Sequence, residues 1–310
     1  MGVSGMGVSG MSRSGYAILE ARGVLKVEGP DTRPFLQGLI SNDINKASPA
    51  RAIYATFLTP QGRYLHDFFI AELSTEMGGA LLLDCEAARL DDLKRRLSMF
   101  KLRSQVTIAT VSDEFAVAAI FGDGWASKLG LPLQAGAAKE WQGGAVFVDP
   151  RLSDAGARAI LPRASLAGIL EQAGFAAKSF ADYDRLRLSL GLPDGSRDMP
   201  VEKAILLENG LDELNGIDWN KGCYLGQELT ARTKHRGLVR KRLLPVSIEG
   251  PMPAPGTPVM AGAEEAGEMH SAVDGMGLAM LRLEYLENGG NAFTAGPARV
   301  IPRKPSWAAF

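Results

Sequence analysis

The residues best suited to chemistry gather in one short segment, residues 220–242, which reads NKGCYLGQELTARTKHRGLVRKR. Gly222 and Gly226, on either side of Cys223, favour a tight turn that brings the backbone close to a ligand or to another chain. The neighbouring cation of Lys221 favours the thiolate form of Cys223, which makes the sulfur more nucleophilic and a better metal ligand. The alternative is that Cys223 is a small, buried apolar residue within a turn.

The same segment ends in a dense cluster of cations, with seven cationic side chains and no acid within residues 232–242. They are Arg232, Lys234, His235, Arg236, Arg240, Lys241 and Arg242. One interpretation is a solvated face of the protein. The other is a site for a polyanion, such as a polyglutamate tail or an RNA backbone.

The composition indicates an ordinary globular protein. The 310 residues are 46% hydrophobic and 22% charged, which allows a sizeable core divided among two or three domains. The formal net charge of -1 supplies no overall field toward nucleic acid or an anionic membrane. The longest apolar run, residues 115–121, is far shorter than the roughly 20 residues of a membrane helix, so we expect no contact with a membrane.

The N-terminus and the two cysteines bear on location and on metal binding. Residues 1–10 contain the pentapeptide MGVSG twice, so residues 1–14 are predicted to be a disordered N-terminus. The pattern of a secretory signal is absent, which predicts a cytoplasmic protein whose Cys85 and Cys223 stay reduced. Two distant cysteines alone form neither a disulfide framework nor a zinc site, and no metal site is predicted.

The elements that must position the reactive segment mix strands and helices. Residues 52–70 are typical of a hairpin whose turn at 60–62 presents polar side chains. Apolar residues at three- and four-residue spacing over 87–100 indicate an amphipathic helix, and a second helix over 183–190 is stopped by Gly191. This mixture predicts α+β layers rather than a doubly wound parallel sheet.

Several stretches of the chain resemble one known family. Residues 221–228, KGCYLGQE, resemble the signature K-G-C-[FY]-x-G-Q-E of the YgfZ family, whose eukaryotic relatives serve mitochondrial iron–sulfur maturation. Residues 35–44 resemble the family's F-L-Q-G-L-x-[ST]-N-D-[IV], and residues 57–63 resemble its F-L-T-P-Q-G-[RK]. Residues 235–237 and 277–282 also fall where family patterns expect them, so the resemblance covers nearly the whole chain.

The YgfZ family shares its fold with the aminomethyltransferase of glycine cleavage, the T-protein. The resemblance therefore implies an α+β, T-protein-like folate-binding fold, in which two interlocked α+β subdomains and a C-terminal antiparallel β-barrel surround a central opening. The implied domains are a folate-binding region over 15–240, with an internal boundary near 108–112, and a barrel over 241–310. Frequent Pro and Gly between short apolar runs after residue 242 agree with a separate β domain.

The resemblance also implies tetrahydrofolate, or a one-carbon derivative of it, as the ligand. Such a ligand requires a carboxylate or amide at its pterin edge, aromatic or apolar contact on its faces, and cations at its glutamate tail. Cys223 and Lys221 are the expected catalytic residues. The expected folate-binding residues are Asn42, Asp43, Gln61, Arg63, Glu208, Tyr224, Gln227, Glu228 and Arg236.

Two positions bear on the comparison with the T-protein pattern. Its pterin-binding carboxylate follows the Leu of an R-L-E-x-G segment, where this chain has Ser189. Folate is therefore expected to bind more weakly than to a true aminomethyltransferase, with Glu208 either as a substitute carboxylate or as a solvated turn residue. Asp91 matches the offset of the T-protein catalytic aspartate, but it also suits the first turn of a helix, and we prefer the helix-dipole interpretation.

Three functions stay open, in order of preference. The first is a tetrahydrofolate-binding factor for iron–sulfur cluster assembly or repair, with Cys223 as its key thiol and with assembly proteins or their client enzymes as partners. The second is an aminomethyltransferase, which would make the protein a folate-dependent one-carbon transferase. The third is a tRNA-modification factor that contacts RNA through residues 232–242.

Overall fold

The hairpin predicted over residues 52–70 belongs to a five-stranded antiparallel sheet with the order β3-β4-β5-β2-β6. In the computed structural model, which describes residues 14–237, 239–287 and 292–310, β3 and β4 are almost wholly buried. Such continuous burial arises because both faces of the sheet are covered. The strands are β2 (Arg22–Glu28), β3 (Ile53–Leu58), β4 (Tyr64–Glu72), β5 (Leu81–Glu86) and β6 (Thr107–Thr110).

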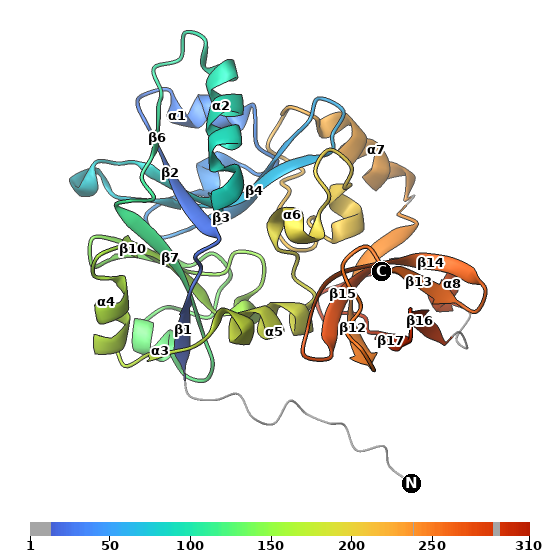
Figure 1. Cartoon of the computed structure of the whole chain (residues 1–310). Coiled ribbons are helices and arrows are strands. Elements are labelled where there is room, and N and C mark those ends of the chain that lie inside the picture. Colours follow the sequence, from blue (N-terminus) through green and yellow to red (C-terminus); the bar gives the residue numbers. More distant parts are fainter. Residues whose placement is uncertain (1–13, 238, 288–291) are drawn as a thin grey trace.

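Two helices cover the outer face of this sheet (Figure 1). They are α1 (Thr32–Gln37) and α2 (Leu90–Lys101). Leu36 of α1 and Leu93 and Leu97 of α2 pack into the same apolar cluster as the sheet. The periodicity over 87–100 thus corresponds to a real amphipathic helix, whose apolar stripe faces the strands.

A six-stranded sheet lies beneath the first, with the order β11-β1-β7-β10-β9-β8. Its outer face is covered by α3 (Trp125–Leu129) and α4 (Leu166–Gln172), which pack onto it through Trp125 and Leu170, among others. Its strands are β1 (Gly15–Ile18), β7 (Phe115–Phe121), β8 (Ala138–Trp141), β9 (Gly144–Val148), β10 (Ala157–Pro162) and β11 (Ala176–Ala177).

The inner faces of the two sheets share one core. Phe69 and Leu82 of the first sheet belong to the same buried cluster as Val117 and Phe147 of the second. The chain interlocks the two layers because β1 pairs with β7 in the second sheet, whereas β2, which follows it directly, lies in the first. Residues 108–112, where an internal boundary was expected, lie at and just after the end of β6.

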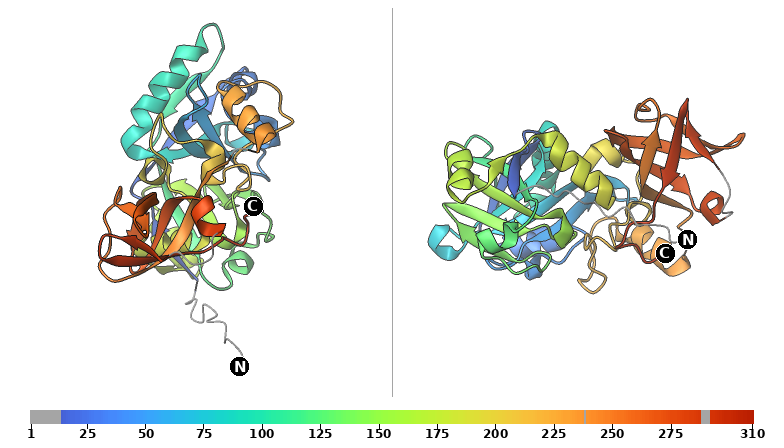
Figure 2. Two further views of the ribbon diagram at one scale, coloured as in Figure 1. Left: turned by 90° about the vertical axis from the view of Figure 1, so that its right-hand side faces the viewer. Right: turned by 90° about the horizontal axis from the view of Figure 1, so that it is seen from below.

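The C-terminal part is a closed antiparallel barrel with the strand order β12-β15-β14-β13-β16-β17 (Figures 1 and 2). The predicted α+β fold with a C-terminal antiparallel β-barrel is therefore confirmed. The barrel strands are β12 (Lys241–Glu249), β13 (Pro258–Ala261), β14 (Glu264–Val273), β15 (Met276–Arg282), β16 (Phe293–Ala295) and β17 (Ala298–Pro302).

Helix α5 (Phe180–Leu190) joins the sheets to the barrel, which it contacts through Leu188. A capping box between Ser179 and Asp182 begins it, and Gly191, with φ of 75°, ends it in the left-handed conformation as predicted. The remaining helices are α6 (Gly195–Asp198), α7 (Gln227–Arg236) and α8 (Glu284–Glu287), with short 3₁₀ turns η1 (Ile44–Lys46), η2 (Thr75–Met77), η3 (Ala87–Arg89), η4 (Ser153–Ala155) and η5 (Leu206–Asn209).

Two further expectations concern the N-terminal segment and contact with a membrane. The segment 1–14, predicted to be disordered, lies outside the described residues except for Ser14. Within the described ranges, no helix has the length and apolar character needed to cross a membrane.

Candidate functional site

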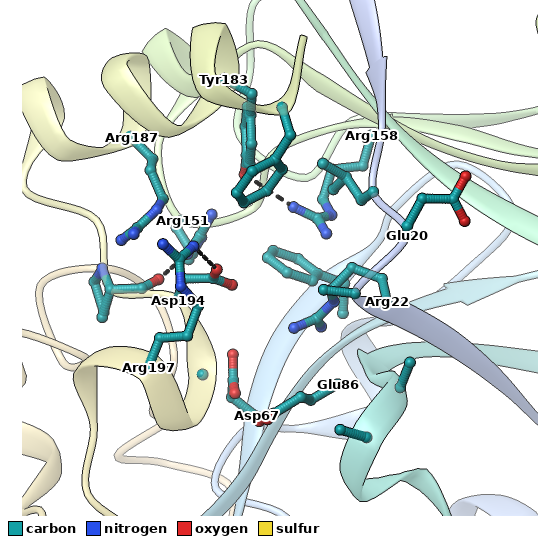
Figure 3. A pocket seen from close by; sticks show the side chains of 18 residues that line it. Glu20, Arg22, Asp67, Glu86, Arg151, Arg158, Tyr183, Arg187, Asp194 and Arg197 are labelled. Carbon is teal, nitrogen blue, oxygen red and sulfur yellow. Dashed lines mark hydrogen bonds and ion pairs between the residues drawn. The ribbon is translucent and has the colours of Figure 1, made fainter. Parts of the chain in front are cut away.

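A cavity of about 300 Å³ opens between the two sheets, α5 and α6 (Figure 3). Its wall combines arginines, carboxylates and aromatic rings, with Arg187, Arg197 and Asp194 on one side and Arg22 and Arg158 on the other. The lining residues that carry its chemistry are Arg22, Asp67, Phe69, Glu86, Arg151, Arg158, Phe180, Tyr183, Arg187, Asp194 and Arg197.

Asp84 of β5, completely buried behind this wall, is shared by two arginines. Arg22 Nε donates to Oδ1 over 2.6 Å, and Arg158 Nε donates to Oδ2 over 2.7 Å. Burial opposes the charge of Arg22, yet the nearby carboxylates, Asp84 first, outweigh burial and raise its pKa. The guanidinium of Arg158 also lies 4.0 Å from the ring centroid of Phe69. This wall is therefore both rigid and cationic.

Arg151 and Asp67 fix the floor of the cavity. Arg151 forms a two-point ion pair with Asp149, over 2.9 and 3.1 Å, and donates to the carbonyl oxygen of Pro193. Asp67 accepts hydrogen bonds from the hydroxyls of Tyr54 and Tyr64, over 3.0 and 2.7 Å. Burial and the Asp67 charge raise the pKa of both tyrosines, so both hydroxyls stay protonated as donors.

The opposite side carries a chain of charges from α5 to α6. Arg187 pairs with Asp184 and Asp198, each over 2.6 Å, while Arg197 pairs with Asp184 and Asp194. Burial opposes ionisation of Asp194, but Arg187, Arg22 and Arg197 outweigh it and hold its pKa well below the ordinary range. Asp194 is thus a permanent carboxylate at the cavity wall.

Aromatic side chains stand at the mouth. Phe180 is 39% exposed, and its ring centroid lies 6.4 Å from that of Tyr183. Glu86, on the opposite side, accepts from the Ser196 hydroxyl over 2.7 Å. Together, flat faces, fixed guanidinium groups and carboxylates suit a planar heterocycle with a polar edge and an anionic extension.

Lys221, one of the residues predicted from the sequence, lies elsewhere, at the end of α1. Lys221 Nζ donates to the carbonyl oxygens of Gln37 and Ile40, over 2.6 and 2.5 Å, and Gln37 Nε2 donates back to the Lys221 carbonyl. Burial lowers the pKa of Lys221 to about 8, although Asp43 and Asp218 oppose the shift. These contacts hold the loop that carries Cys223, whose side chain is exposed.

The turn of the β3–β4 hairpin packs against the same loop. Gly62 and Gly226, with φ of 78° and 80°, lie so close that a Cβ atom on Gly62 would be 2.5 Å from the Gly226 carbonyl oxygen. Gln61 is exposed at this turn, and Arg63 Nη1 donates to the carbonyl oxygen of Lys203 over 2.8 Å. The loop, the hairpin turn and the end of α1 therefore meet at one place.

Asn42 and Asp43 both make hydrogen bonds that stabilise the surrounding backbone. Asn42 Nδ2 donates to the carbonyl oxygens of Tyr54 and Asn215, both over 2.8 Å, and Asn42 lines a second, polar cavity of about 290 Å³. Asp43 caps the 3₁₀ turn η1 by accepting from the backbone N–H of Asn45. Both residues thus shape the chain between α1 and β3.

The other predicted residues are scattered near α7. Tyr224 is buried, Gln227 accepts from the Tyr224 backbone N–H over 3.1 Å, and Glu228 is exposed. Glu208 is half-buried, and burial raises its pKa against the opposing charges of Lys241 and Arg63. The side chain of Arg236 lies outside the described residues. None of the described side chains among the predicted site residues lines the central cavity.

The two positions compared with the T-protein pattern, Ser189 and Asp91, also lie away from the cavity wall. Ser189 donates to the Leu186 carbonyl oxygen within α5 over 2.7 Å, and it is not a lining residue. Asp91 is exposed in the first turn of α2. Within the described parts of the chain, no group of three or more His, Cys, Asp or Glu side chains is arranged to hold a metal ion.

The cationic segment is partly neutralised by nearby acids. Lys234 pairs with Asp212 over 3.3 Å and lies 5.2 Å from the ring centroid of Trp219. Arg242 pairs with Glu213 over 2.7 Å. Lys234 and Arg242 thus have acidic partners within the protein, so this part of the cationic segment does not require a polyanion as its ligand.

The cavity arginines are not among the residues predicted from the sequence, although the chain carries a signal for some of them. Asp84 follows the apolar run Leu81–Leu83, and Arg158 lies in the otherwise apolar strand β10; a charge buried in a strand needs a partner. Their pairing could not be deduced because the partners lie 62 and 74 residues apart in the sequence.

Two family models match this chain. The GCVT N-terminal domain matches residues 13–125, and the CAF17 C-terminal beta-barrel domain matches residues 240–310, the range of the closed barrel. A solved structure, the glycine cleavage system aminomethyltransferase T from Bartonella henselae, superposes with a TM-score of 0.75 over 95% of this chain and 86% of that chain. Its identity is 15%, so it demonstrates the shared fold alone.

Several named proteins align with most of this chain. The mouse "Iron-sulfur cluster assembly factor IBA57, mitochondrial" is 36% identical over 294 residues, which cover 87% of this chain and 78% of the mouse protein. The human protein of the same name is 35% identical over 288 residues, with the same coverage. The homolog from Mycosarcoma maydis is 35% identical and covers 89% of this chain and 75% of its own length.

These relatives correct one prediction. The expected cytoplasmic location is contradicted, because the relatives are mitochondrial by name. That expectation came from a missing secretory pattern, which bears on export and not on organelles inside the cell. The relatives also give no support to tRNA modification.

The resemblance stated from the motifs is thus confirmed at a coarser level. The relatives carry the IBA57 name rather than the YgfZ name. Each of these three relatives is more than 30% identical to this chain, and each match covers more than two thirds of this chain and of the relative. The protein therefore belongs to the family of the iron–sulfur cluster assembly factor IBA57.

Proposed function

We propose that this protein supports iron–sulfur cluster assembly, that it binds a tetrahydrofolate in the central cavity, and that Cys223 is the thiol its assembly role requires. The ligand part of the proposal rests on the cavity wall, in which guanidinium groups and carboxylates lie beside the rings of Phe180 and Tyr183. The relatives named as iron–sulfur cluster assembly factors support the assembly role.

The cavity chemistry fits a folate. Asp67, Glu86 and Asp194 offer acceptors for the amino and N–H groups of a pterin edge, and the aromatic rings offer flat apolar contact. At about 300 Å³ the cavity is at the small end of ligand pockets, so the ring system would be enclosed and the glutamate tail would extend past Arg197, which is about 40% exposed.

The position of Cys223 supports a role with a partner or a cluster rather than with the cavity ligand. The thiol is exposed on a loop that Lys221 holds against the end of α1 and that Gly226 packs against the hairpin turn. Neither Cys223 nor its neighbours line the cavity. The proposal therefore contains two separate places, one for the folate and one for contact with assembly partners or client enzymes.

Calorimetric titration of tetrahydrofolate into the purified protein tests the ligand. Phe180→Ala, which removes a ring at the mouth, should weaken binding about 10-fold. Leu133→Ala, which removes an exposed apolar side chain that is not a lining residue, is the matched control. Absence of heat with the wild type under saturating conditions would refute the folate part.

The assembly role is tested in cells depleted of the protein. Activity of iron–sulfur enzymes, relative to enzymes without a cluster, should return with the wild type and stay low with Cys223→Ser. Equal rescue by Cys223→Ser at equal protein level would show that Cys223 is dispensable. Failure of the wild type to restore the enzymes would refute the assembly role itself.

A further inference from the structure

The turn that ends α2 holds a leucine where glycine is the usual residue. The Ser104 N–H donates to the Lys101 carbonyl oxygen over 2.7 Å, which closes a four-residue turn. Leu102, the first central residue of this turn, has φ of 42° and ψ of -108°, in the region of a type II′ turn. A Cβ atom makes this backbone conformation costly, and glycine normally occupies the position.

The side chain of Leu102 gains no apolar burial that would offset this strain. It is 89% exposed, and it is not a member of the cluster that α2 builds with the first sheet. Met99, three residues earlier, is 57% exposed. Phe100, by contrast, continues the buried stripe of α2, since its ring centroid lies 6.0 Å from that of Phe57. The exposed leucine at a strained position therefore calls for a functional explanation.

Cations accompany the exposed apolar side chains. Residues 93–105 contain five Lys and Arg residues and no acid. Lys101 and Arg103 flank Leu102, and neither has an acid within ion-pair distance among the residues that the structure describes. Asp31 lines a shallow hollow together with Leu102 and Arg103, but its carboxylate already accepts from the Gln105 N–H over 2.7 Å. This end of α2 thus presents apolar side chains next to positive charge.

The turn also lies at an extremity of the molecule. The chain between α2 and β6 projects beyond both sheets, at the top of Figure 1 and of the left view in Figure 2. A projecting end can touch a broad, flat surface with Leu102 and the cations beside it. A protein partner, in contrast, would need a pocket shaped to receive this end.

We propose that the α2 tip, residues 99–103, rests against an anionic membrane surface. Met99 and Leu102 enter the boundary between headgroups and acyl chains, and Lys101 and Arg103 lie beside the lipid phosphates. Apolar side chains next to Lys and Arg are the combination by which proteins lie on anionic bilayers.

This proposal corrects the reach of one expectation. The length of the apolar runs, from which no contact with a membrane was expected, decides whether a chain crosses a bilayer. Contact with the bilayer surface needs no such run. The proposal depends neither on folate nor on Cys223, so it can fail without affecting the proposed function.

Sedimentation of the full chain with vesicles tests the contact. The wild type should bind phosphatidylcholine vesicles that contain about a third phosphatidylglycerol roughly 10-fold more tightly than vesicles of phosphatidylcholine alone, because cations near an anionic surface add to the affinity. Leu102→Asp should weaken this binding about 10-fold. The matched control Leu133→Asp places the same charge at a leucine that is 70% exposed outside the α2 tip, and it should bind like the wild type.

Two results of this experiment would overturn the proposal. One is the absence of wild-type binding to the anionic vesicles, which would leave a pocket on a protein as the occupant of the α2 tip. The other is equal binding of Leu102→Asp and Leu133→Asp. In addition, replacing both Lys101 and Arg103 by Gln should remove most of the preference for anionic over neutral vesicles, and a full preference in this folded variant would also overturn the proposal.

Leu102→Gly separates the membrane contact from stability. Glycine relieves the backbone strain, so this variant should unfold at a higher urea concentration than the wild type. It should nevertheless bind anionic vesicles about 3- to 10-fold more weakly, because the inserted side chain is gone. Unchanged vesicle binding, or unfolding at a lower urea concentration, would overturn the inference that Leu102 is kept for its outward side chain.

Discussion

The α-carbon of Gly62 lies where a side chain would collide with Gly226: a Cβ atom on Gly62 would be 2.5 Å from the Gly226 carbonyl oxygen. Gly62 is in the turn of the β3–β4 hairpin, and Gly226 closes the loop that carries Cys223. Two segments that are far apart in the sequence are thus in backbone contact, and glycine is what permits this contact.

Replacing Gly62 by Ala should therefore separate the hairpin from the loop. We expect the free energy of unfolding in urea to fall by roughly 2–4 kcal/mol, from left-handed strain together with overpacking. Gly222→Ala is the matched control, because Gly222 has φ of 89° but nothing within 4 Å of an added Cβ. It should cost only about 1 kcal/mol. Equal losses for the two variants would show that the contact contributes nothing.

The two cysteines should differ sharply in reactivity. Cys223 is exposed, whereas Cys85 is 1% exposed and its burial raises its pKa to about 12. Iodoacetamide at pH 8 should label Cys223 completely before it labels Cys85, because the thiolate is the reacting species. Mass spectrometry of peptides measures both sites, and urea should abolish the difference. Early labelling of Cys85 in the folded protein would contradict this prediction.

Asp84 should be among the most sensitive positions for stability. Asp84→Asn keeps the shape of the side chain but leaves the charges of Arg22 and Arg158 buried without their shared carboxylate. The expected loss in unfolding free energy is about 3–5 kcal/mol. Asp91→Asn, at an exposed acid of α2, should change it by less than about 0.5 kcal/mol. Similar values for the two variants would mean that the Asp84 pairs do not stabilise the fold.

His66 should make the protein sensitive to acid. Burial, with a further contribution from Arg89, lowers the pKa of His66 from 6.5 to about 4, although Asp92 opposes the shift. The unfolded state therefore binds a proton near pH 6.5, whereas the folded state resists until about pH 4. Stability attributable to His66 is complete above pH 6.5 and falls by on the order of 3 kcal/mol as the pH decreases to 4.

Urea unfolding at several pH values between 7 and 4 measures this effect. His66→Gln should reduce the slope of unfolding free energy against pH in that window, and the exposed-site variant His235→Gln should keep it. Some slope should remain, because burial also lowers the pKa of His270. Asp92 does not interfere, because its pKa is lowered to about 2 and it titrates below the window. A slope that is unchanged in His66→Gln would assign the acid sensitivity to other groups.

Local sequence was enough to predict several elements. Residues 52–70 contain apolar strands around a Pro-Gln-Gly turn, Gly191 stops α5, and α2 follows its three- and four-residue apolar spacing. Such features depend on backbone propensity and periodicity, which act over a few residues.

Only the tertiary structure decided where a ligand could bind. Arg22, Asp84 and Arg158 meet because β2, β5 and β10 of two different sheets come together, and no local pattern encodes such a pairing. Lys221 illustrates the same limit: the sequence placed its ammonium near Cys223, but the fold directs it to the carbonyl oxygens at the end of α1. Burial gives each polar group the partner that the packed structure brings within reach, and that choice is made in three dimensions.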